Sequence, residues 1–244
     1  MQASRPRRPE AGGRIARPVD AAGLVLLRDG CHGPEVLLGR RHRRAAFLPD
    51  IYVFPGGRLD AADSAPSGFP EALHPFVAKQ LKSGRPPLAF ARAAIRETFE
   101  ECGLLLADAP ATAAAAPRPV WQAFAAGQMT PAFAALDFVC RAITPTYSAR
   151  RYNTRFFLAD GSRAVGDLAG DGELDDLAWR PVAALDGLPI VDVTQFVLAE
   201  ALRRWRARIP LGAEPARLFC YRSDTARYRI AGRPGWLPVA SGRT

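Results

Sequence analysis

The sequence predicts an α/β sandwich around a mixed β-sheet, with additional helices inserted between its elements. Apolar runs of strand length alternate along the chain with longer stretches whose apolar residues recur at helical spacing, an order typical of layered α/β domains. A Gly-Gly turn follows one of the strand-like runs, and an acidic helix that ends at a glycine comes later. The chain has 244 residues, of which 48% are hydrophobic, enough for a full core in one domain.

The elements of the first half follow from local patterns. Apolar runs at 21–28 and 35–41 flank the turn-like pair 29–30, which predicts a hairpin with a longer loop. A further strand at 52–54 leads into the Gly-Gly turn. Apolar residues at helical spacing within 69–82 predict a packed helix there.

The second half alternates in the same way. We expect a surface loop in the Ala- and Pro-rich interval 110–119, and a helix or helix pair over 121–136, interrupted at Pro131. The remaining predicted elements are strands at 138–144, 153–158 and 174–179, a short helix through Leu185, and a helix over 194–209. The last helix has several arginines near its end, where cations interact favourably with the helix dipole.

The ends and the composition indicate a cytoplasmic enzyme rather than a membrane protein. Residues 1–18 are rich in Arg, Pro and Gly and predict a disordered basic tail, and residues 19–244 predict a single domain. No apolar run approaches the ~18 residues needed to span a membrane, and no hydrophobic signal segment is visible. The four cysteines are widely spaced, without a C-x-x-C pattern, so we expect reduced thiols.

The net charge of +9 favours an anionic ligand. The basic residues form no stripe interleaved with aromatic residues, and no nucleic-acid-binding motif is recognisable. We therefore expect a small phosphate ester, and no nucleic acid, as the main ligand.

Three carboxylates share one side of the helix that ends at Gly103. At 100° per residue, Glu101 lies about 40° to one side of Glu97 and Glu100 about 60° to the other. Like charges at these spacings destabilise an isolated helix by roughly 0.2–0.5 kcal/mol per pair. Clustered carboxylate oxygens are the ligands that Mg²⁺ and Mn²⁺ prefer, although the pattern alone fits a solvated acidic face equally well.

The Gly-Gly turn and this helix together resemble the signature of the Nudix hydrolases, G-x5-E-x7-R-E-U-x-E-E-x-G-U, in which U is an aliphatic residue. The matching residues are Gly57, Arg96, Glu97, Glu100, Glu101, Gly103 and Leu104. Asp63 stands in place of the first Glu, and Thr98 in place of the first U. The segment between Asp63 and Arg96 is about 25 residues longer than in the signature.

The interruption is similar to that of one Nudix branch, the peroxisomal CoA diphosphatases. That branch also has Phe-Pro-Gly-Gly followed by an Asp, and an Arg-Glu-Thr-Phe-Glu-Glu-x-Gly helix. Segments 143–145, 151–158 and 194–196 look like it too, so the resemblance extends from about residue 21 to about residue 205. It implies a Nudix-type α/β/α sandwich with helical insertions at about 64–88 and 108–136.

The resemblance implies a metal-dependent hydrolase that cleaves the diphosphate linkage of a nucleoside-diphosphate-X substrate, with CoA or acyl-CoA as the candidate. Glu97, Glu100 and Glu101 would bind Mg²⁺ or Mn²⁺. Glu97 and Glu101 are the stronger candidates, and the general base would come from them or from a later acid. Arg96 would orient a glutamate through bidentate hydrogen bonds. The implied catalytic residues are therefore Arg96, Glu97 and Glu101.

A distal acid usually completes such a site. Glu173, six residues before Trp179, is the expected additional metal ligand; Asp176 and a simple loop acid remain alternatives. The expected substrate-binding residues are Arg40 and Arg41 at the end of the second strand, and Gly56 and Gly57, which let backbone approach the helix start.

Other functions stay open from sequence alone. An ADP-ribose or dinucleotide diphosphatase would use the same residues. A non-catalytic nucleotide-binding sensor usually lacks box acids, which are intact here, and an RNA-directed enzyme would need an RNA track that the sequence lacks. We expect a small-molecule nucleotide as partner and no membrane, and a homodimer stays open. The identity of X is not encoded in any readable motif.

Overall fold

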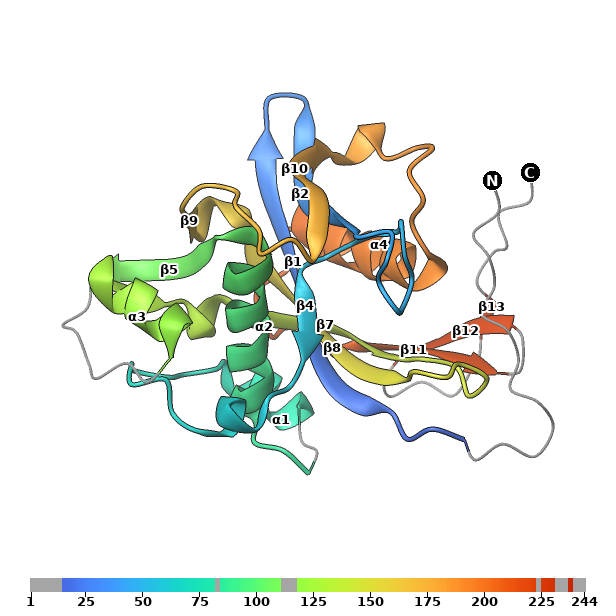
Figure 1. The fold of residues 1–244 in the computed structure, drawn as a ribbon, viewed down its shortest axis with the longest axis horizontal. Coiled ribbons are helices and arrows are strands. Elements are labelled where there is room, and N and C mark those ends of the chain that lie inside the picture. The colour runs from blue at the N-terminus through green and yellow to red at the C-terminus, as the bar shows by residue number, and fades with distance from the viewer. Residues whose placement is uncertain (1–14, 82–83, 111–117, 223–224, 231–236, 239–244) are drawn as a thin grey trace.

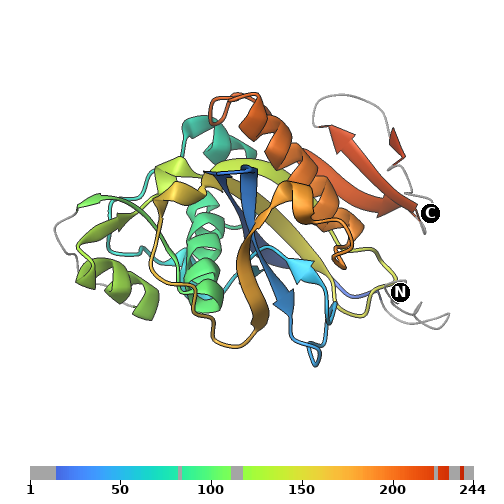
Figure 2. The same ribbon diagram turned by 90° about the horizontal axis from the view of Figure 1, so that it is seen from above.

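The computed structural model describes residues 15–81, 84–110, 118–222, 225–230 and 237–238. A mixed β-sheet forms the central layer, with helix α2 (Pro87–Cys102) on one face and helix α4 (Asp192–Arg206) on the other (Figure 1 and Figure 2). Leu24 and Leu26 of the first strand lie in the core on the α2 side, whereas Val25 and Leu27 lie on the α4 side. This alternation, which follows from the two-residue period of a strand, confirms the α/β/α sandwich.

The main sheet has the strand order β10-β2-β1-β8-β7-β11-β12-β13. Its strands are β1 (Val19–Gly30), β2 (Gly33–Arg41), β7 (Asp137–Ile143), β8 (Tyr152–Asp160), β10 (Leu174–Pro181), β11 (Arg217–Arg222), β12 (Thr225–Ile230) and β13 (Leu237–Pro238). The β1–β8 and β7–β11 pairs are parallel and the other pairs are antiparallel. Two short strands, β3 (Tyr52–Val53) and β4 (Gly56–Arg58), pair with β2 and β1 respectively.

The remaining elements cover the α2 side of the molecule, apart from one short turn at 182–184, whose Val182 packs against the core on the α4 side (Figure 1). Strands β6 (Met129–Pro131), β5 (Leu105–Pro110) and β9 (Ala164–Val165) form a small second sheet in that order. Helices α1 (Pro75–Gln80) and α3 (Pro119–Ala126), and the 3₁₀ turns η1 (Ala61–Ser64), η2 (Phe133–Ala135), η3 (Gly161–Arg163) and η4 (Val182–Ala184), complete the order of elements. In the described ranges, no helix combines the length and the apolar character that crossing a membrane requires.

Most predicted elements are confirmed, and two are wrong in part. The helix predicted over 69–82 is limited to α1, because Pro75 disfavours helical backbone at the residue before it. The helix predicted over 121–136 ends at Ala126, and Gln128 adopts a left-handed backbone before strand β6 begins. Most of the predicted loop and of the basic tail lies outside the described residues. Strands β4, β5, β9, β11, β12 and β13 were not predicted.

Helix α2 ends as its sequence indicates. Gly103 has a φ of 73°, and its N–H donates to the Phe99 carbonyl at 2.8 Å. A Cβ at Gly103 would lie 2.7 Å from the Ala169 carbonyl oxygen and 2.8 Å from that of Asp167. This cap therefore requires glycine both for its backbone conformation and for the close passage of the 167–169 segment.

We expect Gly103→Ala to lower the free energy of unfolding by at least about 1–2 kcal/mol, the usual cost of a left-handed L-residue, with further loss from the backbone contacts. Urea unfolding measures the change. Gly84→Ala is the matched control, because a Cβ there meets nothing within 4 Å, and it should stay within about 0.5 kcal/mol of wild type. Equal effects of the two substitutions would contradict this account.

Candidate active site

The second half of α2 forms one wall of a cavity of about 1170 Å³. Glu97 and Glu101 contribute their carboxylates to it, and Gly56 and Gly57 of β4 contribute backbone. The other walls come from β1, β8, the 142–148 segment and the start of α4. The predicted glycine turn and acidic helix thus meet at one hollow of the molecule.

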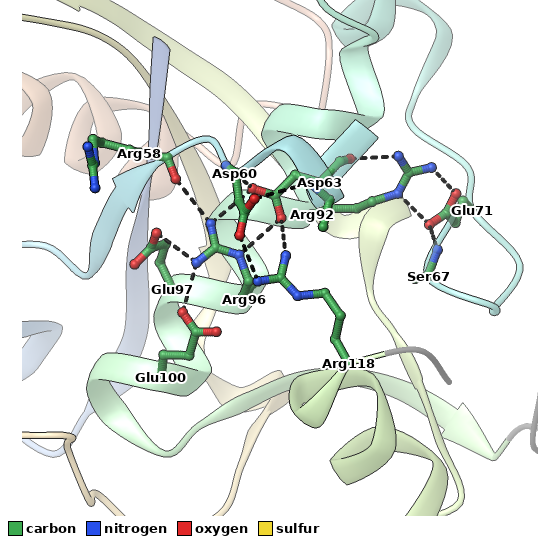
Figure 3. Close-up of polar contacts among 11 residues, drawn as sticks. Arg58, Asp60, Asp63, Ser67, Glu71, Arg92, Arg96, Glu97, Glu100 and Arg118 are labelled. Carbon is green, nitrogen blue, oxygen red and sulfur yellow. Dashed lines mark hydrogen bonds and ion pairs between the residues drawn. The ribbon is translucent and has the colours of Figure 1, made fainter. Parts of the chain in front are cut away.

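Arg96 holds several parts of this site together (Figure 3). Its Nε and Nη2 donate to the two carboxylate oxygens of Asp63 at 3.0 and 2.9 Å. Nη2 also donates to the Arg58 carbonyl at 3.0 Å, and Nη1 donates to Glu97 and Glu100 at 2.8 Å each. Arg96 therefore fixes one oxygen of each of these two glutamates and joins them to the loop that carries Asp63.

Asp63, which replaces the usual glutamate, is 1% exposed. Besides Arg96, it accepts hydrogen bonds from the Asp60 N–H at 2.7 Å and from Arg118 Nη1 at 3.1 Å. Its own carbonyl accepts from Arg92 Nη1 at 2.9 Å. Both the side chain and the backbone of Asp63 are thus held in place.

The interrupting segment has an anchor of its own beside Asp63 (Figure 3). Glu71, from this segment, accepts two hydrogen bonds from the Arg92 guanidinium and one from the Ser67 N–H. The same Arg92 also binds the Asp63 carbonyl. Helix α2 therefore holds both the inserted segment and Asp63, so the insertion does not separate Asp63 from Arg96.

Glu101 is the most deeply buried of the three carboxylates on α2, with 3% of its surface exposed. Its Oε2 accepts a hydrogen bond from the Gly56 N–H at 2.8 Å. The pKa of Glu101 is raised to about 8, chiefly by burial and then by the charges of Glu97 and Glu173, while the hydrogen bond from Gly56 opposes the rise. The pKa of Glu97 is also raised, first by burial and then by Glu100 and Glu173, while Arg96 opposes the shift.

Gly57 makes room for Glu97. A Cβ at Gly57 would lie 2.4–2.5 Å from the carboxylate atoms of Glu97. A side chain at this position would displace the carboxylate, so the glycine has a steric role beyond the turn that the sequence indicated.

The structure separates the two candidate distal acids. Glu173 lines the cavity and is close enough to raise the pKa values of Glu97 and Glu101. Asp176 instead accepts a hydrogen bond from the Tyr52 hydroxyl and pairs with Arg180 at 2.8 Å. The register between β10 and β2 shifts after Asp175, at the position where Asp176 turns away.

The two adjacent arginines also differ. Arg41 lines the cavity, and its charge acts to lower the pKa of Glu101. The residues described as lining the cavity do not include Arg40, which lies 3.9 Å from Asp50. The structure therefore brings Arg41, Gly56, Gly57, Arg96, Glu97, Glu101 and Glu173 to one cavity, with Glu100 exposed and attached to Arg96 beside it.

No three His, Cys, Asp or Glu side chains of the described ranges form a ready-made metal site. Glu97 and Glu100 both turn one oxygen toward Arg96, and Glu101 turns one toward the Gly56 N–H. The charge of Glu100 acts to raise the pKa of Glu97, and the charge of Glu97 acts to raise that of Glu101, but a cation would have to draw the carboxylates together.

Sequence reasoning missed Arg92, Arg118 and Glu71. Each is an ordinary charged residue in its local sequence, and its role depends on partners that lie 21 to 58 positions away. No periodicity or spacing rule could have found these contacts.

Comparison with known proteins agrees with the fold and the box. No protein-family model matches the chain. The structure of a Nudix hydrolase from Alicyclobacillus acidocaldarius is similar with a TM-score of 0.64 and 27% identity, over 83% of this chain and 100% of that one. An acyl-coenzyme A diphosphatase from Gallus gallus is 36% identical over 95 residues, which are 30% of this chain and 25% of that relative. The match thus spans about a quarter of the curated relative's length. The chain thus has a fold like that of the Alicyclobacillus acidocaldarius Nudix hydrolase, and in its fold and its box it is similar to the Nudix hydrolases.

Proposed function

We propose that the protein hydrolyses the diphosphate linkage of a nucleoside-diphosphate-X substrate with Mg²⁺ or Mn²⁺ bound. The observation that carries this proposal is the convergence of Glu97, Glu101 and Glu173 on one cavity that also receives Arg41. A cavity of about 1170 Å³ can accept a substrate with two phosphates and substituents on both sides.

The carboxylates fit a divalent cation in both chemistry and charge. Hard cations prefer carboxylate oxygens. The raised pKa values of Glu97 and Glu101 reflect negative charge that burial leaves poorly compensated, and a cation would compensate it. Glu97 and Glu101 would be the principal ligands, with Glu100 and Glu173 at their sides.

A bound divalent cation would neutralise charge on the diphosphate oxygens and lower the pKa of the attacking water. The protein's own groups would prepare for that chemistry. The Gly56 N–H and Arg96 each hold one oxygen of Glu101 and Glu97, respectively, so that each carboxylate can offer the other. Arg41 would pair with a phosphate oxygen, and a cavity carboxylate would accept the proton of the water.

A nucleotide sensor without activity is less well supported. Such a protein would need the cavity but not the acids, and the half-buried Glu97 and the buried Glu101 are costly to maintain without a cation. Retention of the complete set, with Arg96 and Asp63 beneath it, favours catalysis.

The substrate class rests on likeness alone. The interrupted box and the similarity to an acyl-coenzyme A diphosphatase over 95 residues favour CoA or an acyl-CoA. The products would then be 3′,5′-ADP and a 4′-phosphopantetheine derivative. An ADP-ribose or dinucleotide diphosphatase is the alternative, since the same site would serve it.

We expect Glu101→Gln to lower kcat by at least ~10²-fold, equivalent to about 2.7 kcal/mol of barrier, because a charge that helps hold the cation is lost at constant size. Steady-state kinetics with Mg²⁺ measure the change. Glu35→Gln is the matched control: Glu35 pairs with Arg28 outside the cavity and should leave kcat unchanged. Near-wild-type turnover of Glu101→Gln would contradict the catalytic role of Glu101.

The same substitution should stabilise the metal-free protein at alkaline pH. The pKa of Glu101 is about 8 when folded and ~4.3 when unfolded, so the folded state binds more protons between these values. The unfolding free energy of wild type therefore falls as pH rises through this window. In urea unfolding with a chelator, we expect the advantage of Glu101→Gln over wild type to grow from pH 5 to pH 8.5 by at least about 1.4 kcal/mol, one pKa unit. A difference independent of pH would contradict the shift.

Among CoA, acyl-CoA, ADP-ribose, dinucleoside polyphosphates and nucleotide sugars, we expect CoA or an acyl-CoA to show the highest kcat/KM. Product analysis should yield 3′,5′-ADP. If ADP-ribose or a dinucleoside polyphosphate exceeded CoA tenfold or more, the CoA preference would be overturned, while the diphosphatase proposal would survive.

A further inference from the structure

Arg118 connects the second insertion to the Nudix box. It immediately precedes helix α3, and its guanidinium donates to Asp63 Oδ1 at 3.1 Å and to Asp60 Oδ2 at 3.2 Å (Figure 3). Neither the Nudix signature nor the resemblance to the CoA diphosphatases assigns this residue a role. It does not belong to the residues that line the cavity.

The Arg118 contact joins two carboxylates of the short turn η1. Asp60 caps η1 by accepting from the Ala62 N–H, while the Asp63 side chain accepts from the Asp60 N–H, so the two carboxylates form a reciprocal capping box. Two neighbouring carboxylates repel each other. Arg118 lies across both and compensates that repulsion, with Asp63 buried and Asp60 exposed.

Asp63 in turn determines where Arg96 lies. Its two oxygens receive Arg96 Nε and Nη2, and the rest of the same guanidinium holds Glu97 and Glu100. Aspartate reaches one methylene less far than the glutamate usual at this position, so the correct placement of its backbone matters more. The chain of contacts runs from Arg118 through Asp63 and Arg96 to the glutamates of the cavity.

Helix α3 does not need Arg118 to stay in place. Val120, Trp121 and Phe124 of α3 are buried in the core on the α2 side, and Trp121 and Phe124 contact each other and the nearby Phe133 and Phe69. These apolar contacts anchor the helix. The ion pairs of Arg118 therefore act chiefly on the turn that carries Asp63.

We propose that Arg118 is a positioning residue for the metal-binding glutamates: it holds Asp63 so that Arg96 presents Glu97 to a divalent cation. This inference rests on the proposed function of the same site. Groups in direct contact with metal ligands typically change metal affinity 10–100-fold when removed; Arg118 acts through Asp63 and Arg96, so we expect an effect at the lower end of this range. Arg118→Gln keeps the length and the apolar stem of the side chain but removes the charge that bridges Asp60 and Asp63.

The test is Mn²⁺ binding to the full chain, measured from the electron paramagnetic resonance signal of free Mn²⁺, together with kinetics and thermal unfolding. For Arg118→Gln we expect the Kd for Mn²⁺, and the Mg²⁺ concentration for half-maximal activity, to rise about tenfold. The KM for substrate at saturating metal and the Tm should change little. The Kd for Mn²⁺ of Arg118→Lys should lie between those of wild type and Arg118→Gln, because an ammonium keeps the charge but cannot bridge both carboxylates as the planar guanidinium does.

Arg163→Gln is the matched control. Arg163 pairs with Asp108 between η3 and β5, away from the cavity, and its loss should leave the Kd for Mn²⁺ unchanged. Unchanged Mn²⁺ affinity in Arg118→Gln, or a fall in activity that matches only a fall in folded protein, would overturn the positioning role while leaving the hydrolase proposal intact. Wild-type Mn²⁺ binding weakened by Arg118→Gln, but without turnover of any diphosphate, would instead overturn the proposed function and support the positioning role. A wild type that binds no Mn²⁺ would overturn both.

Discussion

The site depends on one buried guanidinium. A charge inside a protein is stable only when its partners replace the water it has lost. Burial alone lowers the pKa of Arg96, but the hydrogen bonds from Arg96 to Asp63 and the charge of Glu97 raise it well above its usual value. Since the partners come from η1, the end of β4 and two turns of α2, the geometry of the glutamates follows from this one side chain.

The same constraint explains how the box tolerates an interruption. Asp63 and Arg96 must meet in space, but nothing requires them to be close in sequence. The intervening segment is held by the buried Glu71–Arg92 pair, and Arg92 returns to the Asp63 carbonyl. Loop-closure entropy grows only slowly with length, so a long insertion with its own anchors costs the site little.

Local patterns predicted the elements whose causes are local. The α2 helix follows from its apolar period and ends at Gly103, and the β1–β2 hairpin follows from two apolar runs around a turn. The box residues came from resemblance, which also pointed to Glu173. Tertiary contacts could not be predicted from local patterns. Nothing in the sequence around Arg118 indicates its contact with Asp63. The different positions of Glu173 and Asp176 depend on a register shift between β10 and β2. The partial failure at 69–82 was avoidable, because Pro75 already argued against a continuous helix.

The carboxylates of the cavity are held in an arrangement that the folded chain alone does not favour. Glu101 is buried with a single backbone hydrogen bond, and Glu97 shares Arg96 with Glu100 and Asp63, so positive charge is scarce where the carboxylates face the cavity. Gly57 leaves space beside Glu97 that any side chain would fill. The protein thus gives up some stability to keep oxygens available, a common relation between function and folding free energy. Arg96 limits that cost because it compensates charge on one oxygen each of Glu97 and Glu100, while Asp63 and Arg118, which do not line the cavity, hold Arg96 in place.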